Sequence, residues 1–283
     1  MLTVLESLQL SSEYLEKKGI GSPRLNAELL LAEILNCKRL DLYLKFDRPL
    51  DEDEIGKYRD LIARRGKYEP LQYITGKAEF FGLTFKVNNH VLIPRPETEL
   101  MVEAIIERFK DTDQKKILDI GTGSGNIAVT LAKFLKKCSV TSVDVSEEIL
   151  SLARANAERN CASANITFVN ADIKNYSTNG VLFDLVVSNP PYVSLSDFAE
   201  TQREIHEYEP TNAVTDFSDG LTFYKLISSK IGNILKPCGS VYLEVGKGQA
   251  NLVAKLLESN GISEISFIKD YQQIDRIVYG EMK

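Results

Sequence analysis

Apolar positions recur at helical spacing through the first 75 residues. Leucines at 2, 5, 8, 10 and 15 form one stripe, residues 29–35 a second, and residues 51–65 set Ile55, Leu61 and Ile62 against a charged face. Ser22-Pro23 predicts an N-cap followed by proline at the first helical position. No alternating strand pattern interrupts this part, so we expect residues 1–75 to form a small helical bundle.

From residue 115 onward, short β-branched runs alternate with helical patterns. Seven runs are predicted strands: 116–120, 140–144, 166–169, 183–188, 240–245, 264–268 and 276–279. Strands that alternate with helices predict an α/β fold, a doubly wound and mostly parallel sheet with helices on both faces. The turn at 270–275 is too short for a parallel crossover, which needs a dozen or more residues, so we expect the last strand to be antiparallel.

The stretch between these two patterns is aromatic and punctuated by proline. Residues 79–87 predict a short hairpin, and Pro94 and Pro96 lead into a helix over 97–110. A length of 283 residues suggests two domains at about 150 residues each. We therefore expect a helical domain at 1–75, a hairpin linker at 76–96 and an α/β domain at 97–283.

Composition and charge narrow the class of partner. Hydrophobic content of 43% and charged content of 26% are ordinary for a globular protein. Residues 1–88 hold 14 Lys and Arg and 14 Asp and Glu, so the net charge of −6 belongs to the remainder. An acidic half argues against a clamp on nucleic acid, and we interpret the cluster Arg64, Arg65 and Lys67 as a solvated helix end. We expect no direct nucleic-acid partner.

Other classes of protein are disfavoured by what the chain lacks. No apolar run approaches the roughly 20 residues that span a bilayer, and the first residues do not resemble a secretory signal. We expect a cytoplasmic monomer that does not bind membranes. The cysteines are scattered and predict free, buried thiols: Cys37, Cys138, Cys161 and Cys238. With only His90 and His206, the chain gives poor support to a zinc site or a Ser-His-Asp triad, and we expect no metal.

A glycine-rich turn follows the first predicted strand. The candidate ligand-binding residues there are Gly121, Thr122, Gly123, Ser124 and Gly125. Glycines allow a sharp turn and close approach of the backbone to a ligand. The spacing is G-x-G-x-G rather than the dinucleotide fingerprint G-x-G-x-x-G, and no lysine follows for phosphates. The turn therefore suits a nucleoside ligand that lacks a pyrophosphate.

Two acidic residues follow the next two strands. Asp144 ends the second strand, where a carboxylate can accept both hydroxyl protons of a ribose, although Asp144 or Ser146 could instead cap the next helix. Asp172 follows the third strand, where it could accept from an adenine amino group or simply be a solvated turn residue. We predict the ligand role for both.

The most specific pattern is the tetrapeptide Asn189-Pro190-Pro191-Tyr192, directly after a buried strand. The two prolines remove two backbone donors and stiffen the turn. The Asn189 side-chain oxygen and the Pro190 carbonyl then form a pair of acceptors for the two hydrogens of one –NH2 group. Tyr192 offers a flat face to a planar amide or base. The alternative is a purely structural turn, and we predict that Asn189, Pro190 and Tyr192 are catalytic.

At this point the chain resembles the class I methyltransferases, and more closely the HemK/PrmC family of protein-(glutamine-N5) methyltransferases. The tetrapeptide alone also resembles that of amino-methylating DNA and RNA enzymes. The segments that distinguish the family lie at 70–76 (PLQYITG), 80–82 (FFG), 93–99 (IPRPETE), 207–210 (EYEP), 219–220 (DG) and 243–246 (LEVG). The resemblance covers nearly the whole chain and is weakest over the first 65 residues.

The resemblance implies a Rossmann-like methyltransferase sheet, S-adenosylmethionine as methyl donor and S-adenosylhomocysteine as product. It implies that the substrate is the glutamine of the Gly-Gly-Gln motif of peptide chain release factors, and that the helical domain docks them. The 121–125 turn, Asp144 and Asn189 would contact S-adenosylmethionine, as would Asp172 and Ile173, the latter standing where some relatives carry an aromatic residue. Residues 189–192 would hold the glutamine.

Two alternatives remain open. One is an amino-methyltransferase that acts on adenine or guanine in DNA or RNA, which would need a surface for a flipped base. The other is a nucleotide-binding regulatory or dehydrogenase-like module, which would have no use for a pair of acceptors in the tetrapeptide.

Overall fold

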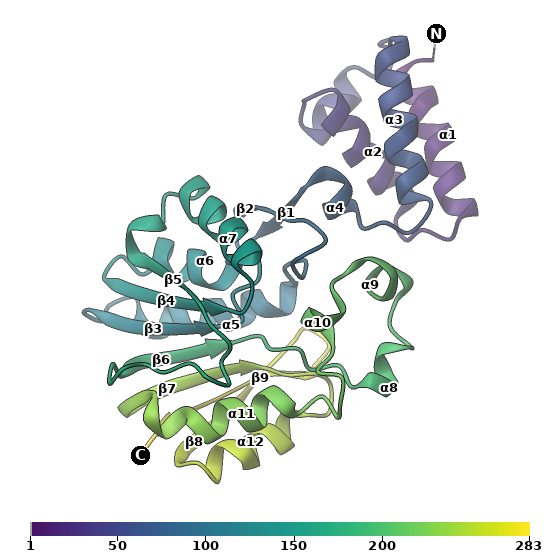
Figure 1. The fold of residues 1–283 in the computed structure, drawn as a ribbon. Helices are drawn as coiled ribbons and strands as arrows, with labels where there is room; N and C mark the ends of the chain where they lie inside the picture. Colours follow the sequence, from purple (N-terminus) through teal and green to yellow (C-terminus); the bar gives the residue numbers. More distant parts are fainter. Residues whose placement is uncertain (1) are drawn as a thin grey trace. The chain divides into compact units, whose positions relative to one another are not determined.

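The computed structural model describes residues 2–283, and the chain falls into two compact units (Figure 1). The smaller unit comprises the residues up to Lys77 together with Gln202–Tyr208. The larger unit comprises Ala78–Thr201 and Glu209–Lys283, so the β-hairpin falls almost entirely within it. A short segment from the second half of the chain therefore belongs to the N-terminal unit.

The smaller unit is helical, as predicted. Its elements are α1 (Val4–Lys17), α2 (Pro23–Ile34), the 3-10 helix η1 (Arg39–Leu44), α3 (Glu52–Arg65), α4 (Leu71–Thr75) and α9 (Arg203–Tyr208). Leu15, Leu30 and Leu31 are fully buried in its core. Capping boxes at Thr3 and Asp51 satisfy the free N–H groups at the starts of α1 and α3.

Ser22 is the N-cap residue of α2, as predicted, but it does not cap the helix through its side chain. Pro23 does stand in the first turn of α2, but Ser22 has a φ of 50° and its side chain makes no cap hydrogen bond. The chain entering α2 is held by Asn26, whose Nδ2 donates to the carbonyls of Gly21 and Ser22 at 2.9 and 3.0 Å. An amide one turn into the helix thus fixes the chain that enters it.

The larger unit is built on a seven-stranded sheet with strand order β5-β4-β3-β6-β7-β9-β8. The strands are β3 (Lys115–Ile120), β4 (Cys138–Asp144), β5 (Ile166–Asn170), β6 (Phe183–Ser188), β7 (Leu235–Glu244), β8 (Ile262–Lys269) and β9 (Asp275–Met282). All seven predicted strands are present. Strand β9 is antiparallel to both of its neighbours, which confirms the prediction for the last strand.

Helices cover both faces of this sheet, as Figure 1 shows. On one face lie α5 (Pro96–Phe109), α6 (Asn126–Phe134) and α7 (Glu147–Arg159), and on the other α11 (Thr222–Lys230) and α12 (Ala250–Glu258). Successive residues of β3 alternate between the two cores, since Ile117 packs in one and Leu118 in the other. Both are fully buried, so the central strands are apolar on both faces.

The chain adds β4 and β5 on one side of β3 and then β6 and β7 on the other side. A cavity lies at this change of direction. Ile120, the last residue of β3, pairs with Val143 of β4 on one side and with Ser188 of β6 on the other. The residues that follow these strands therefore emerge side by side at the carboxyl edge. Such a switch point is where open α/β sheets bind ligands.

The remaining elements are short. The predicted hairpin is confirmed as β1 (Lys77–Phe80) and β2 (Leu83–Lys86). Residues after Tyr192 contain α8 (Leu195–Phe198) and α10 (Thr211–Val214), and the 3-10 turns η2 (Ser163–Asn165) and η3 (Ile231–Asn233) complete the unit. All four cysteines are free, as predicted, but only Cys138 is buried: Cys37 is half-buried, and Cys161 and Cys238 are exposed at positions of positive φ outside the core.

Candidate active site

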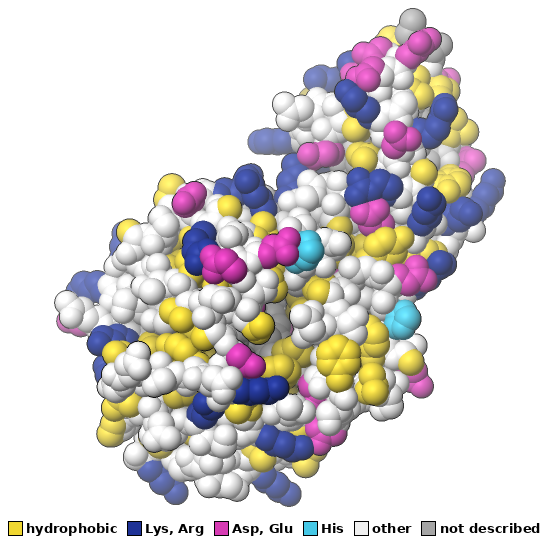
Figure 2. Space-filling view, in the orientation of Figure 1, with side chains coloured by type: hydrophobic (Ala, Val, Ile, Leu, Met, Phe, Trp, Pro, Cys, Tyr) yellow, Lys and Arg dark blue, Asp and Glu magenta, His cyan; other side chains and the backbone are white. Residues whose placement is uncertain are grey.

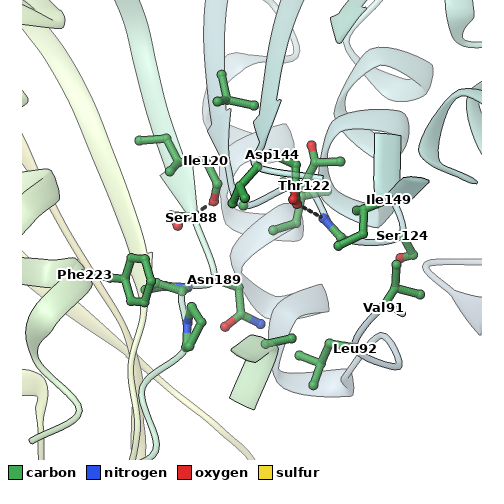
Figure 3. Close-up of a pocket in the computed structure, with 18 of the residues that line it drawn as sticks. Val91, Leu92, Ile120, Thr122, Ser124, Asp144, Ile149, Ser188, Asn189 and Phe223 are labelled. Atoms are coloured by element: carbon green, nitrogen blue, oxygen red, sulfur yellow. Dashed lines mark hydrogen bonds between the residues drawn. The ribbon is translucent and has the colours of Figure 1, made fainter. Parts of the chain in front are cut away.

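A cavity opens at the carboxyl edge of the sheet within the larger unit (Figure 3). Figure 2 shows the surface of this unit hollowed at that edge. The predicted residues that line the cavity are Gly121, Thr122, Gly123, Ser124, Asp144, Asp172, Ile173, Asn189, Pro190 and Pro191. Gly125 and Tyr192 do not line it. The sequence patterns after four different strands therefore converge on one cavity.

The glycine turn has the backbone that its sequence predicts. The φ angles of Gly121, Gly123 and Gly125 are 79°, 53° and 81°, a region that residues with a side chain rarely adopt. A Cβ on Gly121 or Gly123 would meet no atom within 4 Å, whereas one on Gly125 would lie 3.1 Å from the Cβ of Ala153. Gly121 and Gly123 thus leave room for a ligand, and Gly125 allows α6 to approach α7.

A buried carboxylate that sequence reasoning missed supports this turn. Asp119 Oδ2 accepts hydrogen bonds of 2.7 Å from the hydroxyls of Thr122 and Ser142, while Oδ1 is buried without a partner. Burial raises the pKa of Asp119 to about 6. Asp119 lies within the buried run of β3, two residues before the first glycine, and a charged residue in that run was the available signal.

Asp144 faces the cavity, and Ser146 is the helix cap. Ser146 Oγ accepts from the N–H of Ile149, which satisfies the start of α7. The Asp144 carboxylate accepts from the N–H of Gly123 at 3.1 Å and of Ser146 at 3.3 Å. Burial raises its pKa, and its side chain is turned toward the glycine turn (Figure 3). The role of Asp144 at a ribose stays a prediction.

Asp172 and Ile173 both line the cavity, the first with a polar and the second with an apolar side chain. Asp172 is exposed, and its Oδ1 accepts from the N–H of Lys174 at 2.9 Å, as in an ordinary turn. Ile173 is buried and packs against the second core. Ile149 also lines the cavity, so an aliphatic wall is present where a flat ring could lie. The cofactor roles of Asp172 and Ile173 stay predictions.

The tetrapeptide divides between the cavity and the core. Asn189 and Phe223 lie on the side of the cavity opposite Asp144 (Figure 3). Tyr192 packs against the core beside α11 and α12, and its hydroxyl donates to Glu244 Oε1 at 3.3 Å. Burial raises the pKa of Tyr192. Its role as a flat face for the substrate stays a prediction, since its ring does not line the cavity.

Several lining residues have no counterpart in the sequence predictions of site residues. Thr98 and Arg95 come from the segment that enters α5, and Phe223 comes from α11. Arg95 forms an ion pair with the buried Glu209, whose other oxygen accepts from the N–H of Ile93. Ile93 and Arg95 of the motif 93–99 therefore meet Glu209 of the motif 207–210. Over 100 residues separate them, so no local pattern could have paired them.

The described residues 2–283 hold no group of three or more His, Cys, Asp or Glu that could bind a metal ion. Within the same range, no helix is long and apolar enough to cross a membrane.

The seven-stranded, mostly parallel sheet, with a glycine turn after β3, an acid at the end of β4 and Asn189 after β6 at its switch point, has the fold of a Rossmann-like methyltransferase. Two family models match the chain: the PrmC N-terminal domain over residues 6–76 and the methyltransferase small domain over residues 97–207. A methyltransferase structure from Pyrococcus furiosus superposes with a TM-score of 0.52 at 23% identity, covering 71% of this chain and 90% of that one.

Relatives of similar length give the family itself. The chain is 41% identical to a release factor glutamine methyltransferase of Geobacter sulfurreducens, over 99% of this chain and 97% of the relative. It is 37% identical to the protein of the same description from Bacillus subtilis, over 98% and 97% of the two chains. The chain belongs to the release factor glutamine methyltransferase family.

Proposed function

We propose that this protein transfers the methyl group of S-adenosylmethionine to the side-chain amide nitrogen of the glutamine in the Gly-Gly-Gln motif of peptide chain release factors. The observation that supports this most directly is the placement of Asn189. Its carboxamide stands in the cavity beside the glycine turn, and its Nδ2 is engaged by Thr98. Its Oδ1 is therefore free to accept from an incoming –NH2 group.

Three features of the cavity support S-adenosylmethionine as its ligand. Positions 121 and 123 have open space where a Cβ would project, so the backbone can approach the methionine part of the ligand. Asp144 would accept from the ribose hydroxyls, and Ile149 and Ile173 would pack on the adenine. Asp172 would accept from the adenine amino group. When bound, the cofactor supplies a sulfonium methyl, so that an N–C bond forms, an S–C bond breaks and one amide proton leaves to solvent.

The residues of the chain then have two tasks, orientation and charge stabilisation. A glutamine amide nitrogen is a poor nucleophile, because its lone pair is delocalised into the carbonyl. Asn189 Oδ1 and the Pro190 carbonyl would accept both of its hydrogens and so fix the direction of the nitrogen. Positioning of this kind can supply roughly 7–11 kcal/mol in favourable cases. The same acceptors stabilise positive charge as it develops on nitrogen.

The proposal assigns the helical unit to release-factor docking and places the reaction in the cytoplasm. Release factor methylation is the activity in the printed names of the relatives, which supports the protein substrate over a nucleobase. On the surface drawn in Figure 2, Lys and Arg side chains are interspersed with Asp and Glu rather than gathered into one basic stripe. This distribution gives no support to a long phosphate contact.

The test is methyl transfer from isotope-labelled S-adenosylmethionine to a purified release factor, with duplex DNA in parallel. The matched control is the same release factor with its Gly-Gly-Gln glutamine changed to alanine. Label should enter only the intact factor. Asn189→Ala should lose most of the transfer and keep much of the cofactor affinity measured by calorimetry. Label in DNA, or equal label in the alanine control, would contradict the proposal.

A further inference from the structure

A buried chain of hydrogen bonds lies behind the tetrapeptide. Thr98 Oγ1, in α5, lies 2.5 Å from Glu244 Oε2 at the end of β7, and it lies 3.1 Å from Asn189 Nδ2. The other carboxylate oxygen, Glu244 Oε1, accepts from the Tyr192 hydroxyl at 3.3 Å. Thr98 and Glu244 are each only 1% exposed. One buried carboxylate therefore reaches both ends of the tetrapeptide.

The supply of hydrogens fixes the direction of every bond in this chain. When Glu244 is ionised its carboxylate can only accept, so the single hydroxyl hydrogen of Thr98 goes to Glu244. Thr98 Oγ1 is then left with lone pairs alone and needs a donor from its other neighbour. Only the Nδ2 end of the Asn189 carboxamide can donate. The amide must therefore turn its nitrogen to Thr98, which leaves Oδ1 as the end that a ligand meets.

We propose that Thr98 and Glu244 are positioning residues for methyl transfer, which set the orientation of the Asn189 carboxamide through this chain of hydrogen bonds. The inference rests on the proposed function, in which Asn189 Oδ1 accepts from the substrate nitrogen. With the amide reversed, Nδ2 would face the substrate –NH2 group, and two donors would oppose each other. Transfer then fails although every residue of the tetrapeptide is present.

The protonation state of Glu244 decides which way the Asn189 carboxamide is turned. A proton on Oε2 would donate to Thr98, Thr98 would donate to Asn189, and the carboxamide would have to present Oδ1 to Thr98. Burial raises the pKa of Glu244 to about 7. The charged groups that face it are Glu97 of α5, which raises this pKa further, and Arg276 of β9, which lowers it. The orienting form is the ionised one.

Tyr192 is the second attachment of the tetrapeptide to the same carboxylate. Its carbonyl is also held, because Gln249 Nε2 donates to it at 2.8 Å. The backbone carbonyl of Glu244 accepts from the Tyr224 hydroxyl at 2.8 Å, which fixes the end of β7 from the other face. The Glu244 carboxylate is thus held in place, and hydrogen bonds to it orient Tyr192 directly and Asn189 through Thr98.

The test compares three threonine substitutions. Thr98→Val keeps the shape and removes the hydroxyl, so we expect kcat to fall about 10- to 100-fold while the Kd for S-adenosylmethionine stays close to that of the wild type. The Tm should fall by several degrees, because Glu244 Oε2 and Asn189 Nδ2 lose their partner. Thr98→Ser keeps the hydroxyl and should restore most of kcat. Thr130→Val is the matched control, since the Thr130 hydroxyl is fully buried and has no hydrogen-bond partner in the described chain. It should leave kcat unchanged.

The glutamate is tested by the pH profile. Wild-type kcat should fall as the pH drops through about 7, and Glu244→Gln should give a lower kcat without this acidic limb. The proposal is overturned if Thr98→Val keeps full kcat, if Thr98→Ser fails to restore it, or if the two profiles have the same acidic limb. A loss of cofactor affinity in Thr98→Val as large as its loss of kcat would show a merely structural role and would also overturn it.

A measurement without substrate separates this inference from the proposed function. The side-chain –NH2 resonances of Asn189 in the free protein can be assigned by their loss in Asn189→Asp. One of these protons should be shifted downfield by its hydrogen bond to Thr98, and the shift should vanish in Thr98→Val and persist in Thr130→Val. If the wild type methylates no release factor, the proposed function fails while this result still decides the orientation. Resonances unaffected by Thr98→Val would refute the orientation even in an active enzyme.

Discussion

Asn156 connects the hairpin to the glycine turn by hydrogen bonds, and its removal should lower the free energy of unfolding. The residue is fully buried in α7. Its Oδ1 accepts from the N–H of Lys86 at 2.7 Å, and its Nδ2 donates to the carbonyls of Lys86 at 2.9 Å and Ser124 at 2.8 Å. These partners lie 70 and 32 residues away in the chain. One side chain therefore fixes the end of β2 and the turn that lines the cavity.

Asn156→Ala removes three hydrogen bonds and leaves one N–H and two carbonyls without partners. Each buried group left unsatisfied costs about 1–3 kcal/mol. The Ser124 bond is buried and the two Lys86 bonds are partly exposed, so solvent relieves part of the loss. We expect the free energy of unfolding to fall by about 3–5 kcal/mol. For a unit of this size, that corresponds to a Tm lower by roughly 10 °C.

Urea titration of the wild type and the variant, with thermal unfolding beside it, measures this loss. The midpoint should shift to lower urea with little change in the m-value. Asn251→Ala is the matched control, because Asn251 is exposed on α12, and this substitution should change the free energy by less than about 0.5 kcal/mol. Cofactor affinity should also weaken in Asn156→Ala, because the Ser124 carbonyl loses its anchor. A loss below about 1 kcal/mol would refute the reasoning.

Three further predictions follow from the same structure. Asp144→Ala should weaken S-adenosylmethionine binding by about 10- to 100-fold in calorimetry, because a charged acceptor is lost, and an unchanged Kd would remove Asp144 from the ribose site. Gly220→Ala should lower the Tm and the transfer rate, since Gly220 has a φ of 76° and a Cβ there would lie 2.4 Å from the Tyr192 carbonyl oxygen; a wild-type Tm would contradict this. Burial raises the pKa of Glu244 from 4.5 to about 7, so the folded protein holds a proton that the unfolded chain releases. The free energy of unfolding should therefore fall as pH rises between these values, and Glu244→Gln should flatten that slope in urea titrations; equal slopes would count against it.

Local patterns in the sequence were sufficient to predict the elements and the residues at strand ends. The run 183–188 matches β6 at both ends, because a buried strand flanked by a turn has a sharp boundary. Asp144 and Asn189 are in the cavity because residues that follow parallel strands meet at one edge. The glycine turn was predictable because its backbone angles exclude most other residues.

Features that depend on distant partners were not predictable. Thr98 and Glu244 are separated by 146 residues, and neither stands in a pattern that announces a hydrogen bond to the other. The segment 202–208 joins the N-terminal unit, where the Arg65 guanidinium donates to Glu204 Oε1 at 2.5 Å, although its sequence is an ordinary charged helix. Strand order is likewise set by packing between elements rather than by any one of them.

The central claim is methylation of an amide nitrogen on one glutamine of a release factor. Fragment mass spectrometry of a release factor treated with this protein and S-adenosylmethionine tests it most directly. We predict a single added methyl group, located on the side chain of the glutamine in the Gly-Gly-Gln motif and absent when Asn189→Ala replaces the wild type. A methyl group on any other residue, or none on that glutamine under conditions in which the cofactor is bound, would contradict the account.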